Sequence, residues 1–191
     1  MPNYTLLFLF GFWLIIIACE RKPPASDASA AALEKGLEIA GATQAAMSTQ
    51  LQQAMQTGGV PNAVQYCNVA AYPIADSLAK VYQATIRRAT DRPRNALNAL
   101  TEAEAEVFER FQAQQAAGEP MTPIVHSLKN GEYAVYAPIL LQLLCQNCHG
   151  QPSETLQDEH LALIRSLYPD DKATGYIAGD LRGIWSITVK N

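Results

Sequence analysis

Two cysteines and a histidine stand together in the stretch Cys145-Gln146-Asn147-Cys148-His149-Gly150. The spacing C-x-x-C-H is the pattern that attaches a c-type haem. Two thiols three residues apart add to the two vinyl groups on one edge of a porphyrin, and the next residue presents its imidazole to the iron. We therefore predict one haem c, bound covalently through Cys145 and Cys148, with His149 as an axial iron ligand.

Two other chemistries use a C-x-x-C pair. Half of a zinc site would need a second Cys/His pair at suitable spacing, and the chain, with four cysteines and three histidines in all, has none. A thioredoxin-like dithiol would not need His149, and no clear βαβ pattern surrounds the motif. Haem attachment is the interpretation that uses all three residues.

The N-terminus predicts export. Residues 6–18 are almost all apolar, and no charged side chain precedes Glu20. A membrane-spanning helix takes about 20 residues, so this run has the length of a signal-peptide h-region. It ends in Ile16-Ile17-Ala18-Cys19, which resembles a bacterial lipoprotein signal box. We expect residues 1–18 to be a signal peptide, cleaved before Cys19, with diacylglycerol on the Cys19 thiol and N-acylation completing a durable two-chain anchor.

The alternative is an uncleaved N-terminal anchor, because the first five residues contain no Lys or Arg. Either version places the rest of the chain outside the cytoplasm, on the periplasmic side of a bacterial membrane. Glu20 follows the predicted lipidated cysteine, and in a Gram-negative cell this favours sorting to the outer membrane.

Composition fits one exported domain on a tether. The chain has 191 residues and a formal net charge of −4, to which residues 1–18 contribute nothing. Mild acidity argues against nucleic acid and against a basic membrane-binding surface. Residues 19–32 are rich in Pro, Ser, Asp, Ala and Lys and are predicted to be a lipidated tether, and residues 33–191 a single domain.

The domain begins with predicted helices. Residues 31–56 place apolar side chains at steps of three and four, and Thr57-Gly58-Gly59 should stop that helix. Asn62 is a candidate cap for a second helix, which Pro73 should end or kink. Residues 101–117 form a third, because Thr101 followed by Glu104 is a capping box.

The pattern then changes to strands. Residues 123–128 and 133–139 are β-rich and joined by Asn130-Gly131, a strong hairpin turn. A helical patch follows at residues 153–167, and residues 175–177 and 184–189 are predicted strands. Helices followed by a hairpin, one inserted helix and closing strands indicate an α+β fold with an antiparallel sheet.

Four stretches together resemble a family, the PAS-like c-haem domains of exported bacterial proteins, which are often fused ahead of HAMP and histidine-kinase modules. The resemblance covers about residues 31–189. The stretches are Ala63-Val64-Gln65-Tyr66-Cys67; Ile86-Arg87-Arg88-Ala89-Thr90 through Arg92-Pro93-Arg94-Asn95 and Asn98; Cys145-Gln146-Asn147-Cys148-His149-Gly150; and Tyr168-Pro169-Asp170-Asp171-Lys172-Ala173-Thr174-Gly175-Tyr176, continuing into Gly179-Asp180-Leu181-Arg182-Gly183. Departures are modest: Ala89-Thr90 stands where Thr-Ser is expected, and Asn95 is not followed by proline.

The resemblance implies a PAS-like antiparallel sheet behind N-terminal helices, and an unusual second axial ligand, a cysteine from an upstream helix. Cys67 occupies that position. After lipidation and two thioethers it is also the only thiol left, and a free cysteine in an exported protein is oxidised unless it is buried or metal-bound. The alternative is a small buried hydrophobe. Rival ligands are Met47, Met55, Met121, His126 and His160.

The arginines Arg87, Arg88, Arg92 and Arg94 form the only dense basic cluster of the mature domain. A guanidinium group binds a carboxylate in a bidentate fashion, and haem carries two propionates. We expect one or two of the four to contact propionates, the alternative being a solvated loop. Tyr176 and Trp185 are expected to pack in the core or against haem.

Two functions are open at this point. With both axial positions filled, the domain would be a sensor of redox state, or of a diatomic gas that displaces one ligand, read by a separate signalling partner. Alternatively, it would be a membrane-tethered periplasmic electron carrier with a redox partner. An accessory protein with a structural haem is a third, weaker reading. No catalytic triad or paired-carboxylate pattern points to an enzyme.

Overall fold

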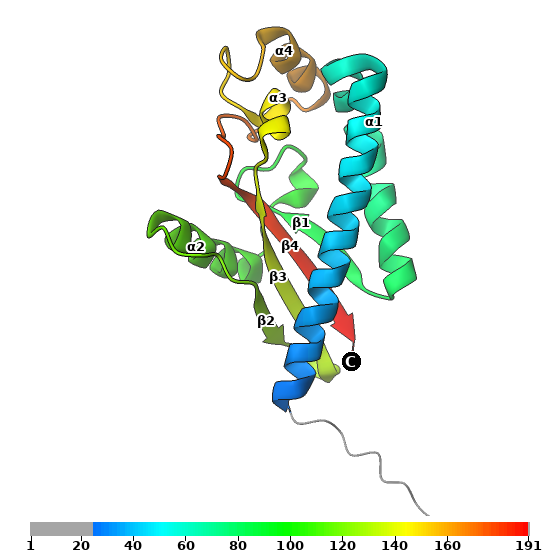
Figure 1. Cartoon of the computed structure of the whole chain (residues 1–191), viewed down its shortest axis with the longest axis vertical. Helices are drawn as coiled ribbons and strands as arrows, with labels where there is room; N and C mark the ends of the chain where they lie inside the picture. The colour runs from blue at the N-terminus through cyan, green and yellow to red at the C-terminus, as the bar shows by residue number, and fades with distance from the viewer. Residues whose placement is uncertain (1–24, 191) are drawn as a thin grey trace, which may run out of the picture.

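A long helical hairpin lies across one face of a four-stranded sheet in the computed structural model, which describes residues 25–190 (Figure 1). Helix α1 (Ala25–Tyr82) forms the hairpin, because Gly58 and Gly59 leave helical geometry within it. Gly59 has φ +66°, a conformation that favours glycine. The predicted signal peptide and Cys19 lie outside the described residues.

Helix α1 corrects two predictions. It begins at Ala25 and buries Ala28 and Ala32, so the second half of the predicted tether is helical and packed. It also continues past Pro73 to Tyr82, so of the two expectations for this proline, an end or a kink of the helix, the end is wrong. Asn62 is not observed as a cap, since its side-chain amide donates to the carbonyl oxygen of Ala54 at 2.8 Å and ties the two arms of the hairpin together.

The sheet is antiparallel throughout, in the order β1-β4-β3-β2. Its strands are β1 (Thr85–Ala89), β2 (Ile124–Ser127), β3 (Glu132–Leu140) and β4 (Leu181–Lys190). The expected hairpin joins β2 to β3, with Asn130 at φ 65° and Gly131 at φ 75°. The pattern missed β1, and residues 175–177, predicted as a strand, form a loop before β4.

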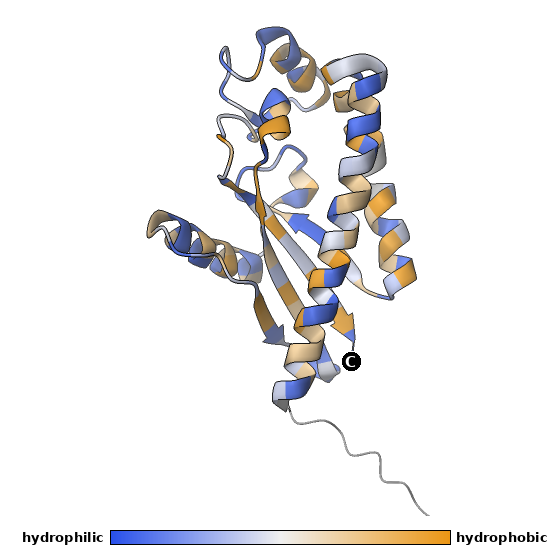
Figure 2. Cartoon of the chain, viewed as in Figure 1, coloured by the Kyte–Doolittle hydropathy of each residue, from blue (hydrophilic) through white to orange (hydrophobic). Residues whose placement is uncertain are grey.

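Alternation along the strands divides the core into two layers. Val135, Ala137 and Ile187 face α1 and pack with Ile39, whereas Ala134, Tyr136 and Ile184 face helix α2 (Glu102–Ala116) on the other side. A period of two places successive side chains on opposite faces of a sheet. Figure 2 shows hydrophobic residues along β3 and hydrophilic residues alternating with more hydrophobic ones along α2. The predicted α+β fold with an antiparallel sheet is confirmed.

Helix α2 begins as predicted. The Thr101 hydroxyl accepts from the Glu104 N–H at 3.3 Å, and the Glu104 carboxylate accepts from the Thr101 N–H at 2.9 Å. Three short 3-10 turns also occur, at Ala96–Asn98, Lys129–Gly131 and Leu143–Cys145. Helices α3 (Gln146–His149) and α4 (Asp158–Leu167) lie between β3 and β4. Between residues 25 and 190, no helix is both long and apolar enough to span a bilayer.

Candidate haem site

The C-x-x-C-H motif follows directly from the end of β3. The 3-10 turn Leu143–Cys145 leads into α3, so both thiols and the imidazole come from little more than one turn of helix. The strand is fixed in the centre of the sheet by β2 and β4. The sheet therefore sets where the motif stands, at one end of the hairpin formed by α1 (Figure 1).

The loop before β4 holds the histidine in one orientation. The Nδ1 atom of His149 lies 2.7 Å from the carbonyl oxygen of Ala173. A carbonyl only accepts, so Nδ1 carries the proton and Nε2 keeps its lone pair. Burial lowers the pKa of His149 well below its usual value, and Arg94 and Arg182 lower it further, so the ring is neutral. A neutral imidazole with a fixed tautomer is the form that binds iron.

Three thiols and this imidazole share one cavity. The cavity has a volume of about 520 Å³ and is lined by Cys67, Cys145, Cys148 and His149, among others. This volume lies in the range of about 300–1,000 Å³ that is typical of cofactor pockets. Its walls come from α1, β1, the end of β3 and the start of β4, and they are mainly apolar. The donor set and the space therefore fit a haem.

Burial raises the pKa of two of the cavity thiols, those of Cys67 and Cys148. Burial raises the pKa of Cys148 to about 11, with Arg94 opposing the shift and Cys67 and Cys145 adding to it. Burial also raises the pKa of Cys67, and Arg88 and Arg94 oppose it. Cys67 lines the cavity from the second arm of the α1 hairpin and is itself exposed.

The rival axial ligands separate by position. Met47 and Met55 line the cavity. Met121 packs instead against the core layer on the α2 side of the sheet, and His126 is exposed and meets the ring of Tyr136 edge-on at 5.5 Å. His160 lies on α4, 3.7 Å from the carboxylate of Glu159. Only the two methionines remain as geometric rivals of Cys67.

Of the four predicted arginines, Arg88 and Arg94 line the cavity and Arg87 and Arg92 do not. Arg87 pairs with Glu104 at 2.9 Å and also donates to the carbonyl oxygens of Leu97 and Ala99. Arg92 donates to the carbonyl oxygens of Lys172 and Thr174, and its guanidinium lies 4.2 Å from the centre of the Tyr176 ring. Arg87 and Arg92 therefore bind other parts of the protein. Of the four arginines predicted to contact propionates, only Arg88 and Arg94 are placed to do so.

Arg94 also contacts the C-x-x-C-H motif. Its guanidinium pairs with the Asp171 carboxylate at 3.2 Å and donates to the carbonyl oxygen of Cys148 at 2.5 Å. Asp171 in turn accepts the N–H of Ala173 at 2.9 Å. Since Ala173 is the residue whose carbonyl binds His149, one arginine links the loop after β1, the motif and the loop before β4.

Sequence reasoning missed Arg182 as a cavity residue. It stands at the start of β4, lines the cavity beside Arg94 and donates from Nη1 to the Thr90 hydroxyl at 3.2 Å. Trp185, expected in the core or against haem, is buried and also lines the cavity. The one available signal was the stretch Gly179-Asp180-Leu181-Arg182-Gly183, in which the arginine is the only basic residue.

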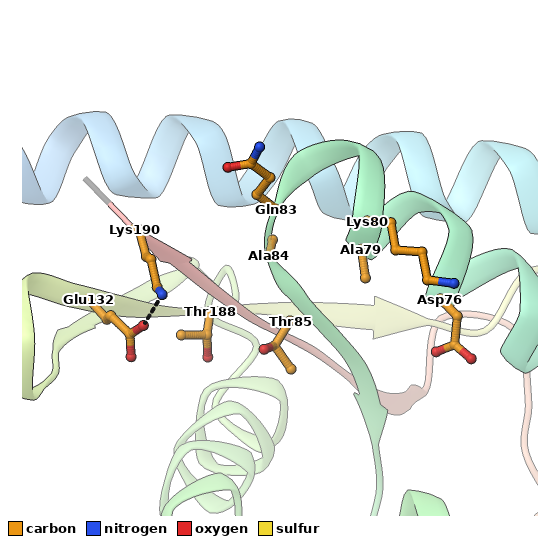
Figure 3. Close-up of a pocket in the computed structure, with 9 residues that line it drawn as sticks. All are labelled: Asp76, Ala79, Lys80, Gln83, Ala84, Thr85, Glu132, Thr188 and Lys190. Carbon is orange, nitrogen blue, oxygen red and sulfur yellow. Dashed lines mark ion pairs between the residues drawn. The ribbon is translucent and has the colours of Figure 1, made fainter.

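A second cavity, of about 500 Å³, lies at the opposite end of the sheet and holds none of these residues. Figure 3 shows its lining, in which Lys190 pairs with Glu132 at 3.5 Å near Thr188 and Thr85. Within residues 25–190, no three or more His, Cys, Asp or Glu side chains form a group that could hold a bare metal ion.

Comparison with known proteins identifies the family. The model of the family described as Tll0287-like matches residues 25–190. The chain belongs to this family. The matched segment begins inside the predicted tether, at the residue where α1 begins. It contains the motif, Cys67 and the three cavity arginines.

A solved structure of the family has the same fold. The crystal structure of the cyanobacterial haem protein Tll0287 matches with a TM-score of 0.53 at 21% sequence identity, covering 77% of this chain and 92% of that chain. The resemblance to a c-haem domain family, inferred from four short stretches, is thereby confirmed at the level of family and fold. No match is found among the curated proteins.

Proposed function

We propose that this protein is an exported c-type haem protein, with His149 and Cys67 as axial ligands, that senses redox state or a diatomic gas. The observation that carries the proposal is the hydrogen bond from His149 Nδ1 to Ala173. It leaves Nε2 as a free electron-pair donor in a cavity that also holds the thiols of Cys67, Cys145 and Cys148.

The cofactor assignment rests on the residues and on a relative. Cys145 and Cys148 would hold one haem by thioether bonds, and His149 would bind the iron from the same turn of helix. The solved relative is named as a haem protein, and this chain shares its fold. A bound haem would supply a reversible one-electron couple. A thiolate ligand from Cys67 would lower the reduction potential by donating electron density.

The placement of Cys67 supports sensing. It lies on residues 60–82, the second arm of α1, between the glycine joint at Gly58-Gly59 and the short connection to β1. Val60 and Val64 on the same arm pack against Leu161 and Ile164 of α4. A shift of Cys67 would thus move both the edge strand β1 and α4, and a partner protein that contacts either element could respond to the movement.

The cellular setting completes the proposal. We infer a lipid anchor at Cys19 that tethers the domain to a membrane on the periplasmic side, from residues 6–18 and the cysteine that follows them. A separate signalling protein would read the sensor. The net charge of −4 supports neither nucleic acid nor catalysis on a polyanion as its task.

An electron carrier is the second candidate, and one observation favours it. Leu143 is 75% exposed and Leu144 is 40% exposed, and both immediately precede Cys145. Leu140, also exposed, lines the cavity with Leu144. An exposed apolar rim beside a redox centre is the kind of surface on which electron-transfer partners dock.

The test compares spectra of the haem-loaded protein and its variants. Absorption and electron paramagnetic resonance spectra are recorded, oxidised and reduced, for the wild type, Cys67→Ser, Met47→Leu and Met55→Leu. We expect a low-spin thiolate signature in the oxidised wild type that disappears only in Cys67→Ser. The two methionine variants are matched controls, because both side chains line the same cavity.

The outcomes separate the two functions. Loss of the thiolate signature on reduction supports the sensor, and its persistence with fast electron exchange supports the carrier. A signature that survives Cys67→Ser and disappears in Met47→Leu or Met55→Leu would contradict ligation by Cys67. Absence of thioether-bound haem in protein made with a cytochrome c assembly system would contradict the whole proposal.

A further inference from the structure

The cavity is strongly and unusually cationic. Arg88, Arg94 and Arg182 all line it, and none of its described lining residues is Asp or Glu. Three guanidinium groups gathered on a largely apolar cavity wall repel one another, and such an arrangement is stable only when anionic groups compensate it. Within residues 25–190, Asp171 pairs with Arg94 alone, so an occupant with anionic groups on the side that faces the arginines would compensate their charge further.

Arg182 is the one of the three with an unused buried donor. Its Nη1 donates to the Thr90 hydroxyl at 3.2 Å, and its guanidinium lies 5.3 Å from the centre of the Tyr176 ring. Its Nε atom is buried and has no hydrogen-bond partner among the described residues. Buried polar atoms are nearly always hydrogen-bonded, so the protein leaves the hydrogen-bonding capacity of the Arg182 guanidinium incompletely used.

The nearest acid does not satisfy this donor. Asp171 acts on Arg182 electrostatically, but its two oxygens accept from Arg94 at 3.2 Å, and one of them also accepts from the N–H of Ala173 at 2.9 Å. Arg94 is correspondingly engaged with Asp171 and with the carbonyl of Cys148. Arg94 is therefore engaged by other groups of the protein, whereas Nε of Arg182 has no hydrogen-bond partner among the described residues.

We propose that Arg182 is the principal binding residue for a propionate carboxylate of the haem, with the guanidinium group that it brings to the cavity wall as the donor. This inference rests on the proposed function, since the carboxylate belongs to the cofactor. It moves the propionate site from the basic cluster in and after β1 to the start of β4. It also gives Thr90 a role, because the Thr90 hydroxyl accepts a hydrogen bond from the Arg182 guanidinium and helps to hold it in place.

The test reads the propionates directly. Haem is labelled with carbon-13 in both propionate carboxyl groups by supplying labelled δ-aminolevulinic acid during expression. Redox-difference infrared spectra of the haem-loaded protein then distinguish propionate bands from those of Asp and Glu. The variants are Arg182→Met, Arg182→Lys and, as the matched control, Arg110→Met, an exposed arginine on α2 that does not line the cavity.

We expect Arg182→Met to shift the labelled carboxylate bands and to lower the reduction potential, because removal of a buried cation favours the ferric state. Arg182→Lys should shift the bands but change the potential less, since the charge stays. Arg110→Met should leave both unchanged. A lowered potential without any change of the labelled bands would overturn the proposal, because it would mean that Arg182 acts only as a distant charge.

Failure of this inference is distinct from failure of the proposed function. A wild type without covalent haem overturns the function itself. A wild type with covalent haem whose labelled bands match those of both Arg182 variants overturns only the role of Arg182. Should Arg182→Met not fold, Arg182→Lys decides alone: shifted labelled bands support the site, and unshifted bands overturn it.

Discussion

His149 and Ala173 are joined by a hydrogen bond of 2.7 Å between Nδ1 and the carbonyl oxygen, across 24 positions of sequence. Two backbone bonds flank it, from the Tyr176 N–H to the carbonyl of His149 at 3.0 Å and from the Gly175 N–H to the carbonyl of Gly150 at 2.8 Å. The loop before β4 thus pairs with the motif and orients its imidazole. This explains why the two stretches occur together: one supplies the ligand and the other fixes its tautomer.

Removal of the imidazole should be reversible by a small molecule. In haem-loaded His149→Ala, we expect loss of the low-spin spectrum, and recovery of that spectrum when free imidazole is added to fill the vacated space. Optical titration with imidazole measures the recovery. His126→Ala and His160→Ala are the controls, since neither residue lines the cavity, and both should keep the wild-type spectrum without imidazole. A wild-type spectrum in His149→Ala would exclude this histidine as a ligand.

The pair Arg94–Asp171 should be a strong stabilising contact. The Asp171 side chain is 2% exposed and that of Arg94 is 13% exposed, so Arg94→Met leaves a buried carboxylate without its cation. Loss of one partner of such a pair costs roughly 3–5 kcal/mol, and we expect the lower end because the Ala173 N–H still binds Asp171. Urea unfolding of the haem-loaded protein measures the cost.

A double-mutant cycle provides the control for this pair. Arg94→Met combined with Asp171→Asn should cost less than the sum of the two single changes, because the second change removes the charge that the first leaves unpaired. If the double change costs as much as the sum of the two single changes, the two side chains contribute independently. That result would contradict the interpretation that this pair holds the C-x-x-C-H motif in place.

Local rules carried much of the sequence-based prediction. The C-x-x-C-H motif, the capping box at Thr101 and the Asn130-Gly131 turn each depend on a few neighbouring residues, and the structure has the turn and the cap where they were expected. The joint at Gly58-Gly59 was found for the same reason. Pro73 shows the weakness of single-residue propensity, because α1 continues past it to Tyr82 although a proline cannot donate a backbone hydrogen bond.

The residues that line the cavity could not be predicted from short stretches of sequence, because strand pairing brings them together. Strand β1 reads as Thr85-Ile86-Arg87-Arg88-Ala89, with two arginines in the middle, and it becomes a strand because β4 pairs with it over its whole length. That pairing brings Arg88 and Arg182 to one cavity although they are far apart in the chain. Arg87 and Arg88 looked equivalent in sequence, but alternation on the strand sends Arg87 to Glu104 and Arg88 to the cavity.

Close approach of α1 to the sheet should make Gly36 sensitive to substitution. A Cβ at Gly36 would lie 2.5 Å from the Cβ of Val135, so Gly36→Ala must push the helix from the sheet. Overpacking of this kind typically costs about 1–3 kcal/mol. Gly41→Ala in the same helix is the control: a Cβ there meets nothing within 4 Å, and alanine should stabilise the helix by about 0.5–1 kcal/mol. Thermal unfolding of both variants measures the difference, and equal Tm values would contradict the packing.

Acid should weaken the fold partly through Glu104. Burial raises the pKa of this carboxyl, but hydrogen bonds from Arg87, the Thr101 N–H and Ser186 outweigh it and lower the pKa below its usual value. A carboxyl with a lowered pKa in the folded state contributes stability that is present above its ordinary pKa and is lost as pH falls through the folded-state value. The contribution should therefore be complete at neutral pH and disappear below about pH 4.

Glu104→Gln tests this dependence. We expect the variant to be less stable than the wild type at neutral pH, because Arg87 loses its ionic partner, and the gap to narrow as the pH is lowered and the wild-type carboxyl takes up its proton. Urea unfolding at several pH values measures the gap. Glu109→Gln, an exposed carboxyl on the same helix, should show little difference from the wild type at any pH. The difference in unfolding free energy between Glu104→Gln and the wild type could instead stay constant from neutral to acid pH. The loss would then arise from the changed hydrogen-bonding groups of the side chain, and the charge of Glu104 would play no part in holding Arg87 against α2.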